Sequence, residues 1–221
     1  MMGLLKSSIG RKFAMALSAF FLMFFLLQHF VINITSIFPD NGATFNKLSH
    51  FMGTNPLIQY VMQPVLIFGV VFHFVMGFVL EVKNNSARNV SYAKNNGGAN
   101  STWMSRNMIW SGAAILAFVV LHFIDFWFPE INHKYIAMLP EDPTRYFHEL
   151  QEKFVNPLRV VAYIVAFVFL ALHLLHGFTS AFQSVGANNK YTKGLKTFCK
   201  VYAIGIPVGF IIIALFHYFN H

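Results

Sequence analysis

The sequence predicts an all-α integral membrane protein, with five transmembrane helices in a single domain, residues 1–221. Of its 221 residues, 56% are hydrophobic and only 11% are charged, a balance that a water-soluble domain of this size rarely shows. A helix needs about 20 apolar residues to cross a hydrocarbon core of roughly 30 Å. Five segments reach this length: 13–34, 57–80, 107–126, 160–182 and 201–219. They leave no stretch of sequence long enough for a soluble domain.

Basic residues gather in alternate connections between these segments. Eleven of the sixteen stand before the first segment and in the second and fourth connections: Lys6, Arg11, Lys12, Lys83, Arg88, Lys94, Arg106, Lys190, Lys193, Lys196 and Lys200. By the positive-inside rule this predicts a cytoplasmic N-terminus and an outer C-terminus. The first segment exceeds 20 residues and lacks a small-residue cleavage site, so we expect a retained helix rather than a signal peptide.

The net charge of +8 does not predict a nucleic-acid partner. The basic residues stand beside membrane spans and form no recognisable nucleic-acid-binding motif. The expected surroundings are membrane lipid, in a membrane that the chain crosses several times.

Four of the predicted helices carry a histidine deep in the apolar run: His29, His73, His122 and His173. An ionisable group inside a bilayer is costly, so each is a candidate functional residue. The alternative is a neutral imidazole that hydrogen-bonds between helices. His217 and His221 stand at the outer end of the last segment, where water is near, and we expect them to be interfacial rather than ligating.

The depths of the four histidines divide them into two pairs. With a rise of 1.5 Å per residue, His29 and His122 lie about 25 and 24 Å from the inner boundary of the membrane, and His73 and His173 about 15 and 16 Å from it. Two histidine pairs stacked in a helical bundle are what two bis-histidine b haems require. Six-coordinate iron leaves no open position for O₂, so the expected role is electron transfer.

Three glycines accompany the inner pair. Gly69 and Gly77 stand four residues before and after His73, and Gly177 stands four residues after His173, so each shares a helix face with its histidine. A flat macrocycle needs bare backbone beside its ligand. Close packing of helices through small residues is the alternative explanation.

The motif H-x-x-x-G-F occurs at 73–78 and again at 173–178, which suggests that two helices solve the same local problem. His176 has Ser180 in place of a glycine four residues later. We therefore expect His173 to be the ligand and His176 to support it, as a neighbour of the ligand or a propionate partner.

Gln59 and Gln63 share a face of the second segment near the outer side. They are interpreted either as interhelical hydrogen-bonding residues or as contacts of a quinone. A transporter without haem is a competing function, since buried neutral histidines also occur in proton relays. Against it, the sequence shows no inverted repeats, and its membrane-embedded acids, Glu81 and Asp125, stand near the interfaces without a clear partner.

Five segments together resemble the dihaem cytochrome b membrane anchor of succinate dehydrogenases and fumarate reductases, of the b558 type. They are FLLQHFVIN (25–33), SHFMGTNP (49–56), VFHFVMG (71–77), VLHFID (120–125) and ALHLLHGF (171–178). The resemblance covers nearly the whole chain, in order. A dihaem cytochrome subunit of a hydrogenase or formate dehydrogenase is the alternative within the same class.

The resemblance implies that His29 and His122 bind the distal haem and that His73 and His173 bind the proximal one. It implies two partners on the cytoplasmic face, a flavoprotein and an iron–sulfur subunit, and a quinone, menaquinone in this family, that reacts near the distal haem. Some members carry a glutamate two residues before the fourth-span ligand for proton transfer; Ala171 occupies that position here. The sequence assigns no catalytic residue and does not decide between succinate oxidation and fumarate reduction.

Overall fold

The computed structural model describes residues 7–86, 107–187 and 191–220. Across these ranges the chain is helical and contains no β-strand. Five helical stretches are long and apolar enough to cross a membrane: Ser8–Ile37, Ile58–Asn84, Met108–Ile136, Pro157–Ser184 and Thr192–Phe219. The prediction of an all-α chain with five spans is confirmed. Some residues used in the prediction of orientation and interface lie outside the described residues: Lys6, Arg88, Lys94, Arg106, Lys190 and His221.

Several spans contain a change of helix type. The first is α2 (Ser8–Ile34) with a 3₁₀ turn (Thr35–Ile37), and the second is a π-helical turn (Ile58–Met62) followed by α4 (Gln63–Ser86). The third consists of α7 (Met108–His122), a π turn (Phe123–Trp127), α8 (Phe128–Ile131) and a second π turn (Asn132–Ile136). The fourth and fifth are α10 (Pro157–Ser184) and α11 (Thr192–Phe219).

Three spans begin earlier than the predicted apolar segments, at Ser8, Pro157 and Thr192, and polar residues cap the first two of these helices. Ser7 accepts a hydrogen bond from the Gly10 amide (2.9 Å) at the start of α2. At the start of α10, the Asn156 side chain accepts from the amides of Leu158 (2.9 Å) and Arg159 (3.4 Å). Such caps satisfy amides that have no partner within the helix. Hydrophobicity therefore predicts which part of each helix crosses the membrane, but not the residues at which the helix begins and ends.

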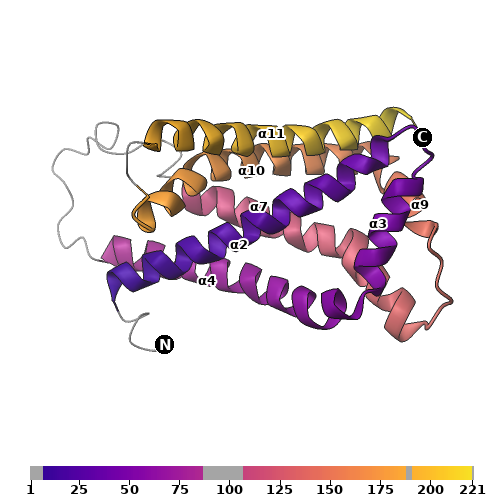
Figure 1. Ribbon diagram of the computed structural model, residues 1–221, viewed down its shortest axis with the longest axis horizontal. Helices are drawn as coiled ribbons and strands as arrows, with labels where there is room; N and C mark the ends of the chain where they lie inside the picture. The colour runs from indigo at the N-terminus through magenta and orange to yellow at the C-terminus, as the bar shows by residue number, and fades with distance from the viewer. Residues whose placement is uncertain (1–6, 87–106, 188–190, 221) are drawn as a thin grey trace.

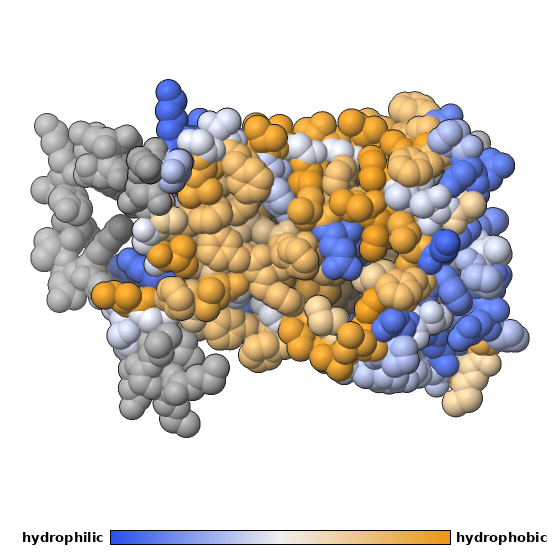
Figure 2. Space-filling model, viewed as in Figure 1, coloured by the Kyte–Doolittle hydropathy of each residue, from blue (hydrophilic) through white to orange (hydrophobic). Residues whose placement is uncertain are grey.

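The five long helices lie side by side along the long axis of the molecule (Figure 1). The start of α2 and the end of α11 lie at opposite ends of this bundle, as an odd number of spans requires. An apolar belt covers its middle, and hydrophilic residues gather at the end where α3 and α9 lie (Figure 2). This is the surface pattern of a bundle surrounded by lipid, in which only the ends meet water.

The helices differ in how far they are buried in the protein. Half of the apolar window of α11 is buried, against 6% of that of the second span. The α11 side packs closely: Ala203 and Ala214 are almost fully buried, and a Cβ added to Gly209 would overlap the ring of Phe30 on α2. Small residues allow this close approach of helices in membranes.

Two short helices cover the end of the bundle at which α11 finishes. One of them follows Asp142 in the connection between the third and fourth spans. It is α9 (Arg145–Phe154), which buries Leu150 and Phe154. The other, α3 (Ala43–Thr54), was missed, because its apolar residues are too few to stand out.

His217 corrects the sequence interpretation. It does lie at the end of α11, but its side chain is fully buried, not exposed to water at an interface. Its Nε2 lies 2.9 Å from the hydroxyl of Ser36, and the ring of Phe154 stacks on it at 6.4 Å. The reason is that α9 folds over the end of α11 and shields it.

Candidate functional site

One histidine pair joins the first and third spans. His29 on α2 and His122, the last residue of α7, have ring centroids 5.7 Å apart with planes nearly perpendicular, at 84°. The ring of Phe25, one turn before His29, stacks on it at 5.5 Å, and the ring of Phe118, one turn before His122, lies 5.9 Å from it with the planes tilted by 31°. This arrangement is called the outer pair below.

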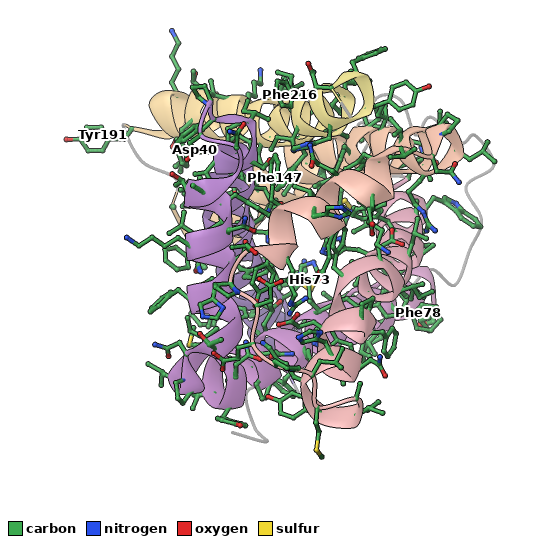
Figure 3. The ribbon with its side chains drawn as sticks, turned by 90° about the vertical axis from the view of Figure 1, so that its right-hand side faces the viewer. Asp40, His73, Phe78, Phe147, Tyr191 and Phe216 are labelled. Carbon is green, nitrogen blue, oxygen red and sulfur yellow. The ribbon has the colours of Figure 1, made fainter. Side chains whose placement is uncertain are left out.

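The other pair joins the second and fourth spans. His73 on α4 and His173 on α10 have ring centroids 6.3 Å apart with an interplanar angle of 66°. Seen down the bundle from the α3 and α9 end, His73 lies near the centre, among the helices (Figure 3). This arrangement is called the inner pair. The ring that faces His73 is that of His173. His176 lies one helical turn after His173 and is half-buried.

Hydrogen bonds fix the level of the inner pair along the bundle. The Ser18 hydroxyl on α2 lies 3.0 Å from Nδ1 of His73, and the Ser111 hydroxyl on α7 lies 3.1 Å from Nδ1 of His173. His29 follows Ser18 by eleven residues along α2, a rise of about 16 Å. His122 follows Ser111 by the same number. The two pairs therefore lie at two levels, and their separation of about 16 Å exceeds the roughly 8–10 Å by which the depths counted along the sequence differ.

The ring separation within each pair is compatible with two ligands of one metal. Two imidazoles bound to opposite sides of one metal through bonds of about 2 Å have ring centroids roughly 6 Å apart, and both pairs match this separation. All four histidine residues are half-buried. The face formed by α2 and α4 is hollowed within the apolar belt (Figure 2).

A bare metal ion fits the same residues poorly. No group of three or more His, Cys, Asp or Glu side chains that could hold a metal occurs among the described residues. Each histidine pair offers two nitrogen ligands, whereas protein sites for bare transition metals ordinarily use three or four. A macrocycle that brings its own equatorial ligands suits two histidines better.

The glycines beside the histidines face neighbouring helices. A Cβ added to Gly77 would lie 3.5 Å from the Met15 side chain, and one added to Gly177 would lie 3.0 Å from that of Met108. A Cβ on Gly69 would lie 2.8 Å from the ring of Phe21. These methionine tips are flexible and could yield to a bound group; Phe21 makes Gly69 a site of close helix packing.

The outer pair is supported differently from the inner pair. The Asn33 amide nitrogen lies 3.4 Å from both ring nitrogens of His29, too far for a good hydrogen bond to either. Within the described part of the chain, Nδ1 of His122 is buried and has no hydrogen-bond partner. A buried polar atom in this state costs free energy unless something binds there.

A charged cluster adjoins His122. Asp125, in the π turn that follows His122, is buried and lies 3.0 Å from the guanidinium of Arg159. The Tyr163 hydroxyl donates to its other oxygen at 2.7 Å, and the Tyr163 ring lies 6.4 Å from that of His122. The expectation that Asp125 has no clear partner is therefore wrong, since both partners are contributed by α10, far away in sequence.

A pocket of about 330 Å³ opens at the end of the bundle where α3 and α9 lie. We call it the end pocket. Its lining residues come from α3, the start of the second span, the end of the third, the connection that follows it and α9: His50, Gly53, Thr54, Gln59, Tyr60, His133, Lys134, Tyr135, Met138, Leu139, Glu141, Asp142, Arg145 and Tyr146. Gln59 lies in its wall, and Gln63 does not.

Ion pairs hold the floor of the end pocket together. Glu130 pairs with Lys134 and with Arg145, which also contacts Glu149 at 2.7 Å. Burial opposes the charge on Arg145, but hydrogen bonds to these two carboxylates outweigh it and raise its pKa above the ordinary value. Burial raises the pKa of Tyr146 to about 12.

Sequence reasoning missed the two serines of the inner pair. A signal for them was present: M-x2-S-x6-F-x3-H occurs at 15–29 and again at 108–122. The Asp125 cluster left no comparable signal, because its members are spread over two spans. Comparison with family profiles, with curated proteins and with solved structures finds no match to this chain.

Proposed function

We propose that this chain is a dihaem cytochrome b membrane anchor of a succinate dehydrogenase or fumarate reductase, in a bacterial inner membrane. One observation carries the proposal. Two histidine pairs, each drawn from two different spans, have ring centroids 5.7 and 6.3 Å apart and lie at two levels about 16 Å apart along the helices. Four unrelated packing histidines would have no reason to adopt this arrangement.

The four histidines have the role of axial ligands. His29 and His122 would hold one b haem, and His73 and His173 would hold the other. When bound, these groups supply two one-electron carriers at successive depths of the membrane. The surrounding aromatic rings, Phe25 and Phe118 among them, exclude water from the ligands.

The basic residues at one end of the bundle support a cytoplasmic docking face there for a flavoprotein and an iron–sulfur subunit. The start of α2, the end of α4 and the start of α11 meet at one end (Figure 1). Basic residues of all three gather there: Arg11, Lys12, Lys83, Lys193, Lys196 and Lys200. By the positive-inside rule this end faces the cytoplasm, which puts the N-terminus inside and the C-terminus outside.

The end pocket is the proposed site of the quinone, menaquinone or a related one. It lies at the opposite end from the basic residues, near the outer pair. A chain of contacts joins the two sites: Gln28, next to His29, donates to the sulfur of Met52 (3.5 Å), and Gln59 in the pocket wall donates to the Met52 carbonyl (2.7 Å). Gln59 is therefore the proposed quinone contact, while Gln63 is assigned to helix packing.

The first test is a reduced-minus-oxidised absorption spectrum of the purified chain with a pyridine haemochrome assay. Two b haems per chain are expected, and their absence would favour the transporter or a structural bundle. The pairing is then tested with alanine variants and low-temperature EPR. His29→Ala and His122→Ala should disturb one haem, and His73→Ala and His173→Ala the other.

His176→Ala is the matched control, since it removes an imidazole from the same helix as His173 but from no pair. Both haems should remain. If His29→Ala and His73→Ala damaged the same haem, the pairing would be wrong. Extraction in mild detergent followed by mass spectrometry tests the partners: recovery of hydrogenase or formate dehydrogenase subunits, instead of a flavoprotein and an iron–sulfur subunit, would support that alternative.

A further inference from the structure

The inner histidines are each held by a serine from a neighbouring helix. Ser18 contacts His73 at 3.0 Å and Ser111 contacts His173 at 3.1 Å. Both hydroxyls also donate to the carbonyl three residues earlier on their own helices, Ser18 at 2.8 Å and Ser111 at 2.9 Å.

These contacts determine which ring nitrogen carries the proton. A hydroxyl has one hydrogen, and in each serine a backbone carbonyl accepts it. The hydroxyl oxygen must then accept from the histidine, so Nδ1 of His73 and of His173 is the N–H nitrogen. In a neutral imidazole the other nitrogen, Nε2, is left with a free lone pair, which is the form that binds a metal.

The arrangement occurs twice with the same parts. Met15, whose carbonyl accepts from Ser18, lies with its side chain 3.5 Å from a Cβ added to Gly77, four residues after His73. Met108 and Gly177 have the same relation around His173, at 3.0 Å. One serine near one histidine could be incidental. Recurrence of methionine, serine, histidine and glycine in the same roles indicates a common function.

The two halves are related as parallel repeats. M-x2-S-x6-F-x3-H lies on α2 and α7, which run in one direction, and H-x3-G lies on α4 and α10, which run in the other (Figure 1). The next residue is a phenylalanine in both repeats, but its surroundings differ. Phe78 is exposed, whereas Phe178 is buried against α11. The repeated part is thus the part around the inner pair.

We propose that Ser18 and Ser111 are positioning residues for the inner haem, which they serve by fixing the tautomer and orientation of both axial imidazoles and by lowering the reduction potential of that haem. This rests on the proposed function. A hydrogen bond accepted from Nδ1–H makes the imidazole a stronger donor, which favours ferric over ferrous iron. Among the described residues no serine contacts the outer pair, so we expect the effect at the inner haem alone.

The experiment uses the full chain carrying its haems, with Ser18→Ala, Ser111→Ala and the double variant. The readouts are a spectroelectrochemical titration and the low-temperature EPR spectrum of each haem. Losing a bond of this kind typically weakens metal binding by about tenfold or more. A tenfold loss confined to the ferric state raises a one-electron potential by about 59 mV. We expect the inner haem to shift upward in each single variant, further in the double variant, and the outer haem not to shift.

Two further sets of variants separate positioning from packing. Ser→Thr at both positions keeps the hydroxyl and should leave the reduction potential of the inner haem at its wild-type value. Ser→Cys keeps the shape with a weaker hydrogen bond and should raise that potential less than Ser→Ala does. Ser184→Ala is the control: it removes a serine of α10 that donates to the Ser180 carbonyl (2.9 Å) and should change neither haem. Loss of the inner haem from the alanine variants, with recovery in Ser→Thr, also supports the proposal.

Unchanged potentials in two-haem alanine variants would overturn the inference and leave the proposed function standing. A shift of the outer haem, or equal loss of the inner haem from the alanine and threonine variants, would also overturn it. A wild-type chain without haem would remove the proposed function itself. The two failures are therefore distinguishable.

Discussion

Removing either member of the buried Asp125–Arg159 pair should destabilise the fold to very different degrees. Asp125 is 3% exposed, whereas the Arg159 side chain is 33% exposed. Arg159→Met leaves a carboxylate inside the bundle with the Tyr163 hydroxyl as its remaining hydrogen-bond donor at 2.7 Å. Asp125→Asn keeps a side chain that can still accept from Tyr163, and leaves a guanidinium that can reach water.

The magnitudes follow from this difference in burial. Breaking a buried pair so that one charge stays uncompensated costs about 3–5 kcal/mol, so Arg159→Met should lower the free energy of unfolding by about 3 kcal/mol. Asp125→Asn leaves no charge buried, because the guanidinium can reach water, and it loses a contact with a net worth of about 1 kcal/mol, so it should cost about that much. The double variant Asp125→Asn with Arg159→Met removes both charges and should recover most of the loss seen in Arg159→Met.

The assay is reversible unfolding of the purified chain in mixed detergent micelles, followed by circular dichroism. A double-mutant cycle over the four proteins gives the coupling between the two side chains. Equal losses from the two single variants, or a double variant no more stable than Arg159→Met, would refute the assignment of the cost to the buried carboxylate.

Two further pairs of variants test helix packing and the end pocket. Gly209→Ala should destabilise the chain by about 1–3 kcal/mol because its Cβ would overlap the ring of Phe30, whereas Gly205→Ala, with open space around the added carbon, should be neutral or stabilising in the same unfolding assay. Gln59→Ala should weaken labelling of the chain by a photoreactive quinone, and Gln63→Ala should not; equal labelling of the two variants would contradict the proposed quinone contact.

Much of the fold was predictable because hydrophobicity alone determines which segments cross a membrane. Depth also predicted the histidine pairs, since each helix rises by a constant amount per residue and a straight bundle preserves level. The 3.6-residue period cannot predict where a helix changes to a π turn, and so the position of Asp125 was not predictable. The burial of His217 was not predictable either, because it depends on α9, a helix that packs on His217 only in the folded chain.

The serines of the inner pair represent a different kind of omission. Their spacing to His29 and His122 is visible in the sequence, but a small polar residue in a span has several ordinary uses, including bonding to its own helix backbone. Ser18 does this as well as contacting His73. Only the three-dimensional contact identifies the second use.

The π turn after His122 has a consequence for how this span can tolerate changes in length. A π turn closes its hydrogen bond over one residue more than an α turn, so Phe123–Trp127 holds the equivalent of a one-codon insertion. When the extra residue is gained or lost, the turn changes between π and α, and the helices on either side keep their orientation about the helix axis. A one-residue deletion there would leave His122 facing His29 and Glu130 facing Arg145, and would displace chiefly Asp125. A one-residue change in the length of this turn would therefore affect chiefly the Asp125 carboxylate.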